Sequence, residues 1–403
     1  MSLDLPNTAM QVDRMANEFG GRVSELKQHL SNGLRAVERF NLEAYVSKLE
    51  EHSNDVQYPA PVLTDVPGNR FKVSGLPKDF SVVSVDGSHI DVDRHMSAKC
   101  FLINIGIAVL NYGSKPYADL FSSPRLYATH DELVIRDSKT YREQSIEGTV
   151  LGAKRTVEEI RGLVNAIEGL SPNIPTLALL DGSLLMLGLV GNQYQEFVLR
   201  ELVEDGFIEA LDKLRNMASQ RPMYVASYIS FPGSTEVVNA LKLAECSYNT
   251  SDANYRCGLS IEGRKPCDQC VGGIFDRDLY SEILGSGERS MMYTTSSRIS
   301  GTYYAGNEVN FFYLNVGEEI GRVEVPSWIA EDTSSVELVH SLILDQCRRG
   351  QGYPIGLMEA HEQAVLESSD RNYFLELVED TLQSRGVTVQ SSEKSRSKRL
   401  RWL

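Results

Sequence analysis

Residues 176–183 read TLALLDGS, an apolar run that ends in Asp-Gly-Ser. Such a run is typical of a strand that is covered on both faces of a sheet. Residues 82–88 read VVSVDGS and end in the same three residues. Helical spacing at about 153–167 and 193–219 alternates with these strands and with another strand at 223–229. This alternation predicts an α/β core in which helices flank a central sheet.

The composition is that of an ordinary folded protein. Hydrophobic residues make up 42% of the 403 residues and charged residues 24%, which argues against disorder and against a fibrous protein. The longest apolar stretch, residues 101–110, is far shorter than the ~20 residues that a helix needs to cross a bilayer. The N-terminus lacks the basic and apolar regions of a secretory signal. We therefore expect a cytoplasmic protein without a membrane span.

The overall charge is unusual for a protein that binds nucleic acid, because the net charge is −15 and the pI is near 5.0. A site that collects carboxylates around a metal is locally acidic, however, and a positive surface needs to line only one groove. One basic cluster, residues 394–401, lies near the C-terminus. It is typical of a flexible solvated tail, and the alternative is an arm that grips DNA.

The patterning along the chain predicts three regions. Residues 7–52 have helical spacing, and a connector rich in Pro and Gly follows them. The core begins near residue 80, and residues of about 245–307 mix Gly, Cys and charge and are interpreted as an insertion. Further strands are predicted at 311–315 and 322–325, and helices at 334–347, 354–368 and 372–385. The predicted regions are 1–78, the helical N-terminal region and connector; 79–388, the core domain with its insertion; and 389–403, a basic flexible tail.

The two Asp-Gly-Ser motifs are the strongest candidates for chemistry. An aspartate at the end of a buried strand has a rigid backbone behind it and an open crevice ahead. Two such strands would bring Asp86 and Asp181 together, and their oxygen ligands suit Mg²⁺ or Mn²⁺. A third carboxylate is expected from Glu158 or Glu159 in the helix before the second strand. The alternative is that each Asp-Gly is a simple turn and each glutamate part of a solvated helix face.

Four cysteines raise a separate question. Cys267 and Cys270 have the spacing of a zinc knuckle, and Cys246 and Cys257 could complete a four-thiolate site for structural Zn²⁺ or an iron–sulfur cluster. Ordinary reduced thiols are the alternative. Nearby, Arg277 and Arg289 are candidate nucleic-acid contacts, with solvated loop arginines as the alternative.

Several motifs together resemble the NurA family of nucleases. Val85-Asp86-Gly87-Ser88 and the stretch 179–184, LLDGSL, are similar to the first two strand motifs of that family. Residues 322–326, RVEVP, followed by residues 352–354, GYP, and then Ala360-His361 resemble its closing block. The resemblance runs from about residue 80 to about residue 385, with short motifs in the family's order.

The resemblance implies an RNase H-like core with a mixed sheet and a homodimer. It also implies a Mn²⁺- or Mg²⁺-dependent DNA nuclease with 5′ to 3′ exonuclease and single-stranded DNA endonuclease activity. The family's nucleases act in DNA end resection and repair with the HerA hexameric ATPase. Two other functions stay open: a non-catalytic DNA-processing adaptor of the same fold, and an RNase H-like enzyme acting on RNA.

The resemblance also implies roles for particular residues. Asp86, Asp181 and one glutamate would ligate metal, and Glu159 is favoured because the family tends to place Arg four residues before it, as Arg155 stands here. Tyr353 and His361 would complete the active site, with His361 ligating metal or positioning the scissile phosphate. One departure concerns a lysine that many relatives carry after the strand matching residues 225–229, because residues 227–231 read SYISF. Lys242 is the nearest candidate substitute.

Overall fold

The computed structural model describes residues 3–52, 59–91, 99–189, 194–246, 267 and 271–387. The predicted tail at 389–403 and most of the segment around Cys257 and Cys270 lie outside these residues. The chain divides into two compact units, each assembled from separated segments. Unit 1 comprises Met1–Val73, Ile229–Ser297 and Asn310–Val323, and unit 2 comprises Ser74–Tyr228, Arg298–Val309 and Glu324–Leu403.

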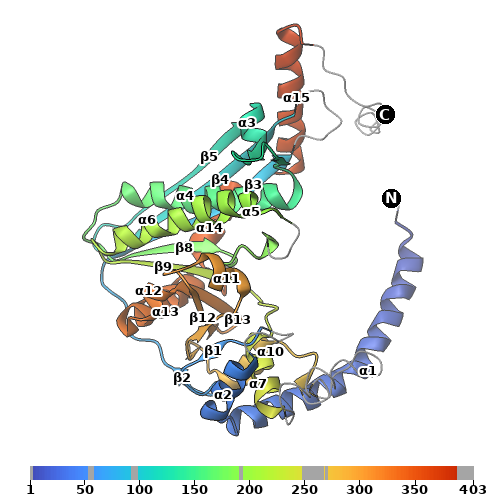
Figure 1. The fold of residues 1–403 in the computed structure, drawn as a ribbon, viewed down its shortest axis with the longest axis vertical. Helices are drawn as coiled ribbons and strands as arrows, with labels where there is room; N and C mark the ends of the chain where they lie inside the picture. The colour runs from blue at the N-terminus through green and yellow to red at the C-terminus, as the bar shows by residue number, and fades with distance from the viewer. Residues whose placement is uncertain are drawn as a thin grey trace. The chain divides into compact units, whose positions relative to one another are not determined.

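A mixed sheet forms the centre of unit 2 (Figure 1). Its strands lie in the order β9-β8-β3-β4-β5, with β3, β4 and β5 antiparallel and β3, β8 and β9 parallel. This is the strand arrangement of the RNase H-like fold, so the predicted fold class is confirmed. The strand bounds are β3, Phe80–Asp91; β4, Phe101–Tyr112; β5, Tyr117–Tyr127; β8, Thr176–Asp181; and β9, Met223–Ile229.

Helices cover both faces of this sheet. The predicted helices at 153–167 and 193–219 are present, the second as a continuous run of α5, a π-helical segment η2 and α6. The helical bounds in unit 2 are α3, His130–Leu133; α4, Gly148–Glu168; η1, Leu187–Leu189; α5, Glu196–Leu199; η2, Arg200–Ile208; α6, Glu209–Ala218; α11, Arg298–Tyr303; α12, Ser327–Ala330; α13, Thr333–Arg349; α14, Ile355–Ala364; and α15, Ser368–Ser384. A small hairpin pairs β6, Val134–Arg136, with β7, Glu143–Ser145.

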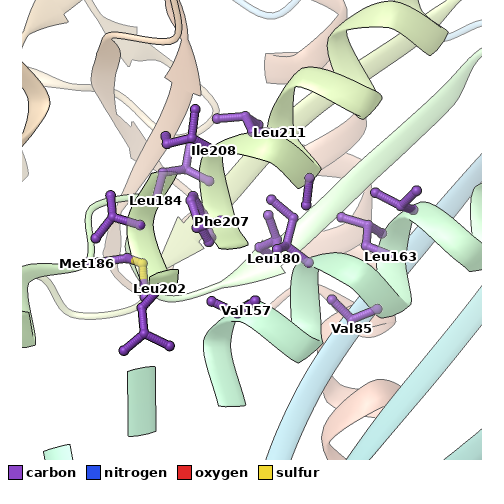
Figure 2. Close-up of a cluster of buried hydrophobic side chains, with 14 of the residues drawn as sticks. Val85, Val157, Leu163, Leu180, Leu184, Met186, Leu202, Phe207, Ile208 and Leu211 are labelled. Carbon is purple, nitrogen blue, oxygen red and sulfur yellow. The ribbon is translucent and has the colours of Figure 1, made fainter. Parts of the chain in front are cut away.

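The core of unit 2 lies between the sheet and the helices α4 and α6. Figure 2 shows side chains from β3, β8, α4, η2 and α6 gathered there, including Val85, Leu180, Val157 and Phe207. Alternate residues of β3, Val83 and Val85, belong to this core. Ser84 between them, and Asp86 after them, must therefore face the opposite side of the sheet, because successive strand side chains alternate.

Unit 1 has its own core of aromatic and aliphatic side chains, among them Tyr45, Tyr280, Tyr293 and Phe311. Part of the segment interpreted as an irregular insertion is regular here, since it contains α10, β10 and β11. The bounds in unit 1 are α1, Leu5–Glu38; α2, Leu42–His52; β1, Val62–Leu63; β2, Arg70–Phe71; α7, Glu236–Glu245; α10, Asp276–Ile283; β10, Arg289–Ser290; and β11, Tyr293–Thr294. Strands β12, Val309–Asn315, and β13, Ile320–Pro326, lie mainly in this unit.

No helix in the described part of the chain is both long and apolar enough to cross a bilayer.

Candidate active site

Asp86 lies within strand β3 and not at its end, which corrects the expectation from the sequence. β4 continues to pair with β3 from Asp86 to Asp91, so the strand stays hydrogen-bonded beyond the Asp-Gly-Ser motif. The pairing of β8 with β3 ends at Val85 and Leu180. Asp86 therefore lies where one neighbouring strand ends, and Asp181 is the next residue of that neighbour.

Helix α14 brings His361 to Asp86. Nδ1 of His361 lies 2.7 Å from Oδ2 of Asp86. This approach requires Gly106, the β4 residue opposite Asp86, because a Cβ at Gly106 would lie 2.1 Å from the carbonyl oxygen of Ala360. The Asn104 side-chain amide fixes the end of α14 by donating to the carbonyl of Ala364 at 3.0 Å. A polar residue and a glycine on β4 thus determine where the histidine lies.

Helix α4 brings Glu159 to the site from the other face of the sheet. A Cβ at Gly87 would lie 2.6 Å from Oε1 of Glu159, so the glycine leaves the space that this carboxylate occupies. Glu159 is only 7% exposed. Burial, together with the charges of Asp86 and Asp181, raises the pKa of Glu159 to about 7, although the Arg155 guanidinium 3.0 Å away opposes this shift.

Glu158, the other candidate, has different surroundings. It forms ion pairs with Lys154 at 3.0 Å and with Arg161 at 3.2 Å. Although burial opposes them, these cations lower the pKa of Glu158 below its ordinary value. Of the two glutamates, Glu159 thus lies beside Gly87, the residue after Asp86, whereas Glu158 pairs with two cations of its own helix.

Tyr353 contacts the second aspartate. Its hydroxyl donates to Oδ1 of Asp181 at 2.8 Å, and its ring packs edge-on against Tyr228, with the centroids 5.7 Å apart. Burial and the charge of Asp181 raise the pKa of Tyr353, so the hydroxyl keeps its proton. Burial also raises the pKa of Asp181, which the hydrogen bond from Tyr353 opposes. The turn before Tyr353 needs Gly352, whose φ is +115°.

The loop after Asp181 is fixed by a residue that sequence reasoning missed. Glu324, 1% exposed, accepts hydrogen bonds from the Ser183 hydroxyl and from the Leu184 backbone N–H, both at 2.8 Å. The buried Tyr304 hydroxyl donates to the carbonyl of Leu184 at 2.8 Å. Because these contacts fix the chain just after Asp181, they restrict where its carboxylate points. The available signal was an acid within the otherwise apolar part of the RVEVP strand.

The donor chemistry of the site fits a hard divalent cation. Asp86, Glu159 and Asp181 supply carboxylate oxygens, the ligands that Mg²⁺ and Mn²⁺ prefer. A bound cation would offset the mutual repulsion that helps to raise the pKa values of Glu159 and Asp181. Within the described part of the chain, no three His, Cys, Asp or Glu side chains converge as a ligand set. Each carboxylate instead contacts its own partner: His361, Arg155 or Tyr353.

The two candidate phosphate-binding arginines belong to unit 1. Arg289 is 5% exposed and lies over the Phe71 ring at 4.3 Å. Arg277 lies over the Phe231 ring at 3.8 Å and donates to the carbonyl of Pro232 at 2.8 Å. Both guanidinium groups therefore have aromatic contacts within their own unit.

The cysteine hypothesis falls mostly outside the described residues. Cys246 and Cys267 are described and are not in disulfides, whereas Cys257 and Cys270 lie outside. A four-thiolate metal site stays a prediction.

Comparisons with known proteins bear on the family and the fold. Residues 80–366 match the family model described as the NurA domain. A crystal structure of NurA with manganese is 13% identical, with a TM-score of 0.37, and the match covers 84% of this chain and 96% of that one. A NurA structure bound to dAMP and manganese is 13% identical, with a TM-score of 0.32 and coverages of 77% and 90%. Endonuclease V from Ciona intestinalis in complex with a 23mer DNA is also 13% identical, with a TM-score of 0.32 and coverages of 83% and 97%. The search of curated proteins finds no match.

Proposed function

The chain belongs to the NurA family, and we propose that it is a divalent-metal-dependent deoxyribonuclease. It acts as a 5′ to 3′ exonuclease and as an endonuclease on single-stranded DNA. Its role is to process DNA ends during repair, as a homodimer in the cytoplasm and together with a HerA-like hexameric ATPase. The observation that carries the proposal is the buried Glu159 carboxylate, whose Oε1 lies beside Gly87, the residue that follows Asp86.

In this proposal Asp86, Glu159 and Asp181 hold the metal, with His361 as a further ligand or phosphate contact. When bound, the metal supplies a water nucleophile at neutral pH and neutralises charge that develops on the phosphate. The remaining steps belong to side chains of this protein. Because a carboxylate only accepts hydrogen bonds, Nδ1 of His361 donates to Asp86. The His361 side chain is 61% exposed, so its Nε2 is available to a substrate oxygen.

Tyr353 and Arg155 orient the other two carboxylates. The Tyr353 hydroxyl holds one oxygen of Asp181 and leaves the second oxygen available for a ligand role. Arg155 neutralises Glu159 and keeps a cation beside the carboxylates, where a phosphodiester would carry its negative charge. Such fixed donors need no reorganisation as charge develops, which is how preorganised sites lower a barrier.

A substrate panel tests the proposal. Purified protein is incubated with labelled single-stranded DNA, duplex DNA, RNA and an RNA–DNA hybrid, each with Mn²⁺, Mg²⁺ or EDTA, and with or without a HerA-like ATPase. We expect metal-dependent cleavage of DNA, and its loss in Asp86→Asn and Asp181→Asn. Cleavage confined to RNA or the hybrid would instead identify a ribonuclease. Absence of cleavage under every condition would identify a non-catalytic adaptor.

A further inference from the structure

Helix α1 carries one apolar stripe along its whole length, but only part of that stripe is covered. Near its C-terminal end, Leu30, Leu34 and Val37 pack against the core of unit 1. The same face continues toward the N-terminus, since these positions are separated by three- and four-residue steps. There the stripe is exposed, with exposed fractions of 52% for Val12, 51% for Met15, 56% for Phe19, 45% for Val23 and 37% for Leu26.

The exposed half of α1 is a poor helix on its own. Gly20 and Gly21 lie in its middle, and within the described chain no atom other than the adjoining helix backbone and the neighbouring residues comes within 4 Å of where their Cβ atoms would be. A glycine in a helix interior is less favourable than alanine by roughly 1 kcal/mol. Most helical stability in proteins comes from packing of an apolar face. We therefore expect a partner to cover the exposed apolar stripe.

The spacing of the stripe suits a second copy of the same helix. Val12, Met15, Phe19, Val23 and Leu26 are separated by three, four, four and three residues, so the pattern is symmetric about Phe19. Two antiparallel copies related by a two-fold axis at Phe19 would place Val12 opposite Leu26 and Met15 opposite Val23. Each apolar residue would then meet an apolar residue, as an isologous interface requires.

The charges beside the stripe are complementary in the same arrangement. At 100° per residue, Asp13 and Lys27 lie on one flank and Glu18 and Arg22 on the other. In an antiparallel pair related by a two-fold axis, each flank lies beside the same flank of the second copy, with its residues in reverse order. Asp13 then lies within about two residues of the level of Lys27 from the second copy, and Glu18 lies equally close to Arg22. Both ion pairs occur twice in the pair of helices.

We infer that residues 5–28 of α1 form an antiparallel helix pair with the same residues of a second copy. Apolar contact supplies the affinity, and the flanking charges select the antiparallel orientation. The inference concerns unit 1 alone and holds whether or not the nuclease proposal does. It also gives the proposed homodimer a specific contact surface.

Disulfide trapping in the full-length protein tests the geometry. Phe19→Cys lies on the two-fold axis and should form a disulfide with its own copy. The control Met10→Cys is 64% exposed but lies on the opposite side of the helix. We expect at least about tenfold more linked dimer for Phe19→Cys, because pairing raises the local thiol concentration. Peptide mass spectrometry separates these links from links through the six native cysteines.

A mixture of Val12→Cys and Leu26→Cys should link to each other, and Val12→Cys alone should not. Self-linking of Val12→Cys would indicate a parallel pair. Equal linking of Phe19→Cys and Met10→Cys, or none in either, would mean that this face binds another protein or nothing. Each of these results overturns the inference.

A charge exchange provides a second readout. Asp13→Lys or Lys27→Asp alone should weaken dimerisation, measured by light scattering over a dilution series, because each places like charges together. The double variant should restore it. If both single variants dimerise as the wild type does, the antiparallel register is wrong.

Discussion

The ionised carboxylate of Glu159 destabilises the folded protein. Its carboxylate is buried, is repelled by the charges of Asp86 and Asp181, and has a pKa of about 7 against an ordinary 4.5. An acid whose pKa is raised in the folded state destabilises that state once the unfolded chain ionises the group. The destabilisation is absent well below pH 4.5, grows between pH 4.5 and about 7, and is complete above pH 7.

Glu159→Gln should therefore stabilise the metal-free protein at pH 8. Each unit of pKa shift corresponds to about 1.4 kcal/mol, so a gain of a few kcal/mol is expected, and the raised pKa already includes the opposing effect of Arg155. At pH 5 the gain should largely vanish. Urea unfolding of both proteins in EDTA at the two pH values measures the effect. A variant less stable than the wild type at pH 8 would contradict this account of Glu159.

Glu324 gives a second prediction at the residue scale. Glu324→Ala removes the acceptor for the Ser183 hydroxyl and the Leu184 N–H. The buried Leu184 N–H then lacks a partner, which typically costs about 1–3 kcal/mol, and the part-buried Ser183 hydroxyl loses its acceptor as well. Because the loop positions Asp181, Mn²⁺ affinity measured by calorimetry should also fall, by about 10–100-fold.

Glu324→Gln is the matched control, since its carbonyl oxygen can accept both hydrogen bonds. It should keep most of the stability and most of the Mn²⁺ affinity. If Glu324→Ala binds Mn²⁺ as tightly as the wild type, Glu324 has no role in positioning Asp181.

At the scale of elements, glycines set how closely two helices approach the sheet. Gly106→Ala would place a Cβ against the Ala360 carbonyl and push α14 away from β4. Overpacking of this kind typically costs about 1–3 kcal/mol, and it should also separate His361 from Asp86. The midpoint temperature of thermal unfolding and the rate of DNA cleavage should both fall.

Gly152→Ala is the matched control for that prediction. Gly152 lies inside α4, and apart from its two neighbours and the adjoining helix backbone no described atom lies within 4 Å of its Cβ position. Alanine is favoured over glycine in a helix interior by roughly 0.5–1 kcal/mol, so this variant should be slightly more stable. Equal losses in the two alanine variants would show that close approach of α14 is not the cause.

The sequence predicts the buried elements of unit 2 well and the exposed ones poorly. β8 and β9 follow from apolar runs, and α4 follows from its helical spacing. β5 was not predicted, because almost all of its residues are exposed and no buried face produces an alternating pattern. The continuation of β3 beyond Asp86 was also missed, since it depends on pairing with β4 and not on the residues of β3 themselves.

Some residues of the site can be predicted from the local sequence, whereas others depend on long-range contacts. Asp86 and Asp181 stand out because each follows an apolar strand. Glu159 could not be separated from Glu158 by local spacing, since the distinction depends on Gly87, on a different element. Glu324 reaches Ser183 across 141 residues of sequence, so no local pattern reveals their contact.

For the whole molecule, the main difficulty is that its compact units are not continuous in sequence. Unit 1 combines the N-terminal helices with two later segments, 229–297 and 310–323. The composition along the chain shows where one segment ends and the next begins. It does not show which distant segments fold together. The family motifs survive this interruption because each one spans only a few consecutive residues.

The central claim is that Glu159, together with Asp86 and Asp181, forms the metal site that cleaves DNA. The most direct measurement compares Glu159→Gln with Glu158→Gln, two neighbouring and isosteric changes in the same helix. Cleavage of labelled single-stranded DNA and Mn²⁺ binding by calorimetry are measured for both variants and for the wild type. We expect Glu159→Gln to lose at least about 100-fold in cleavage rate and to bind Mn²⁺ weakly, while Glu158→Gln stays within a few-fold of the wild type. An equal loss in both variants, or a larger loss in Glu158→Gln, would contradict the claim.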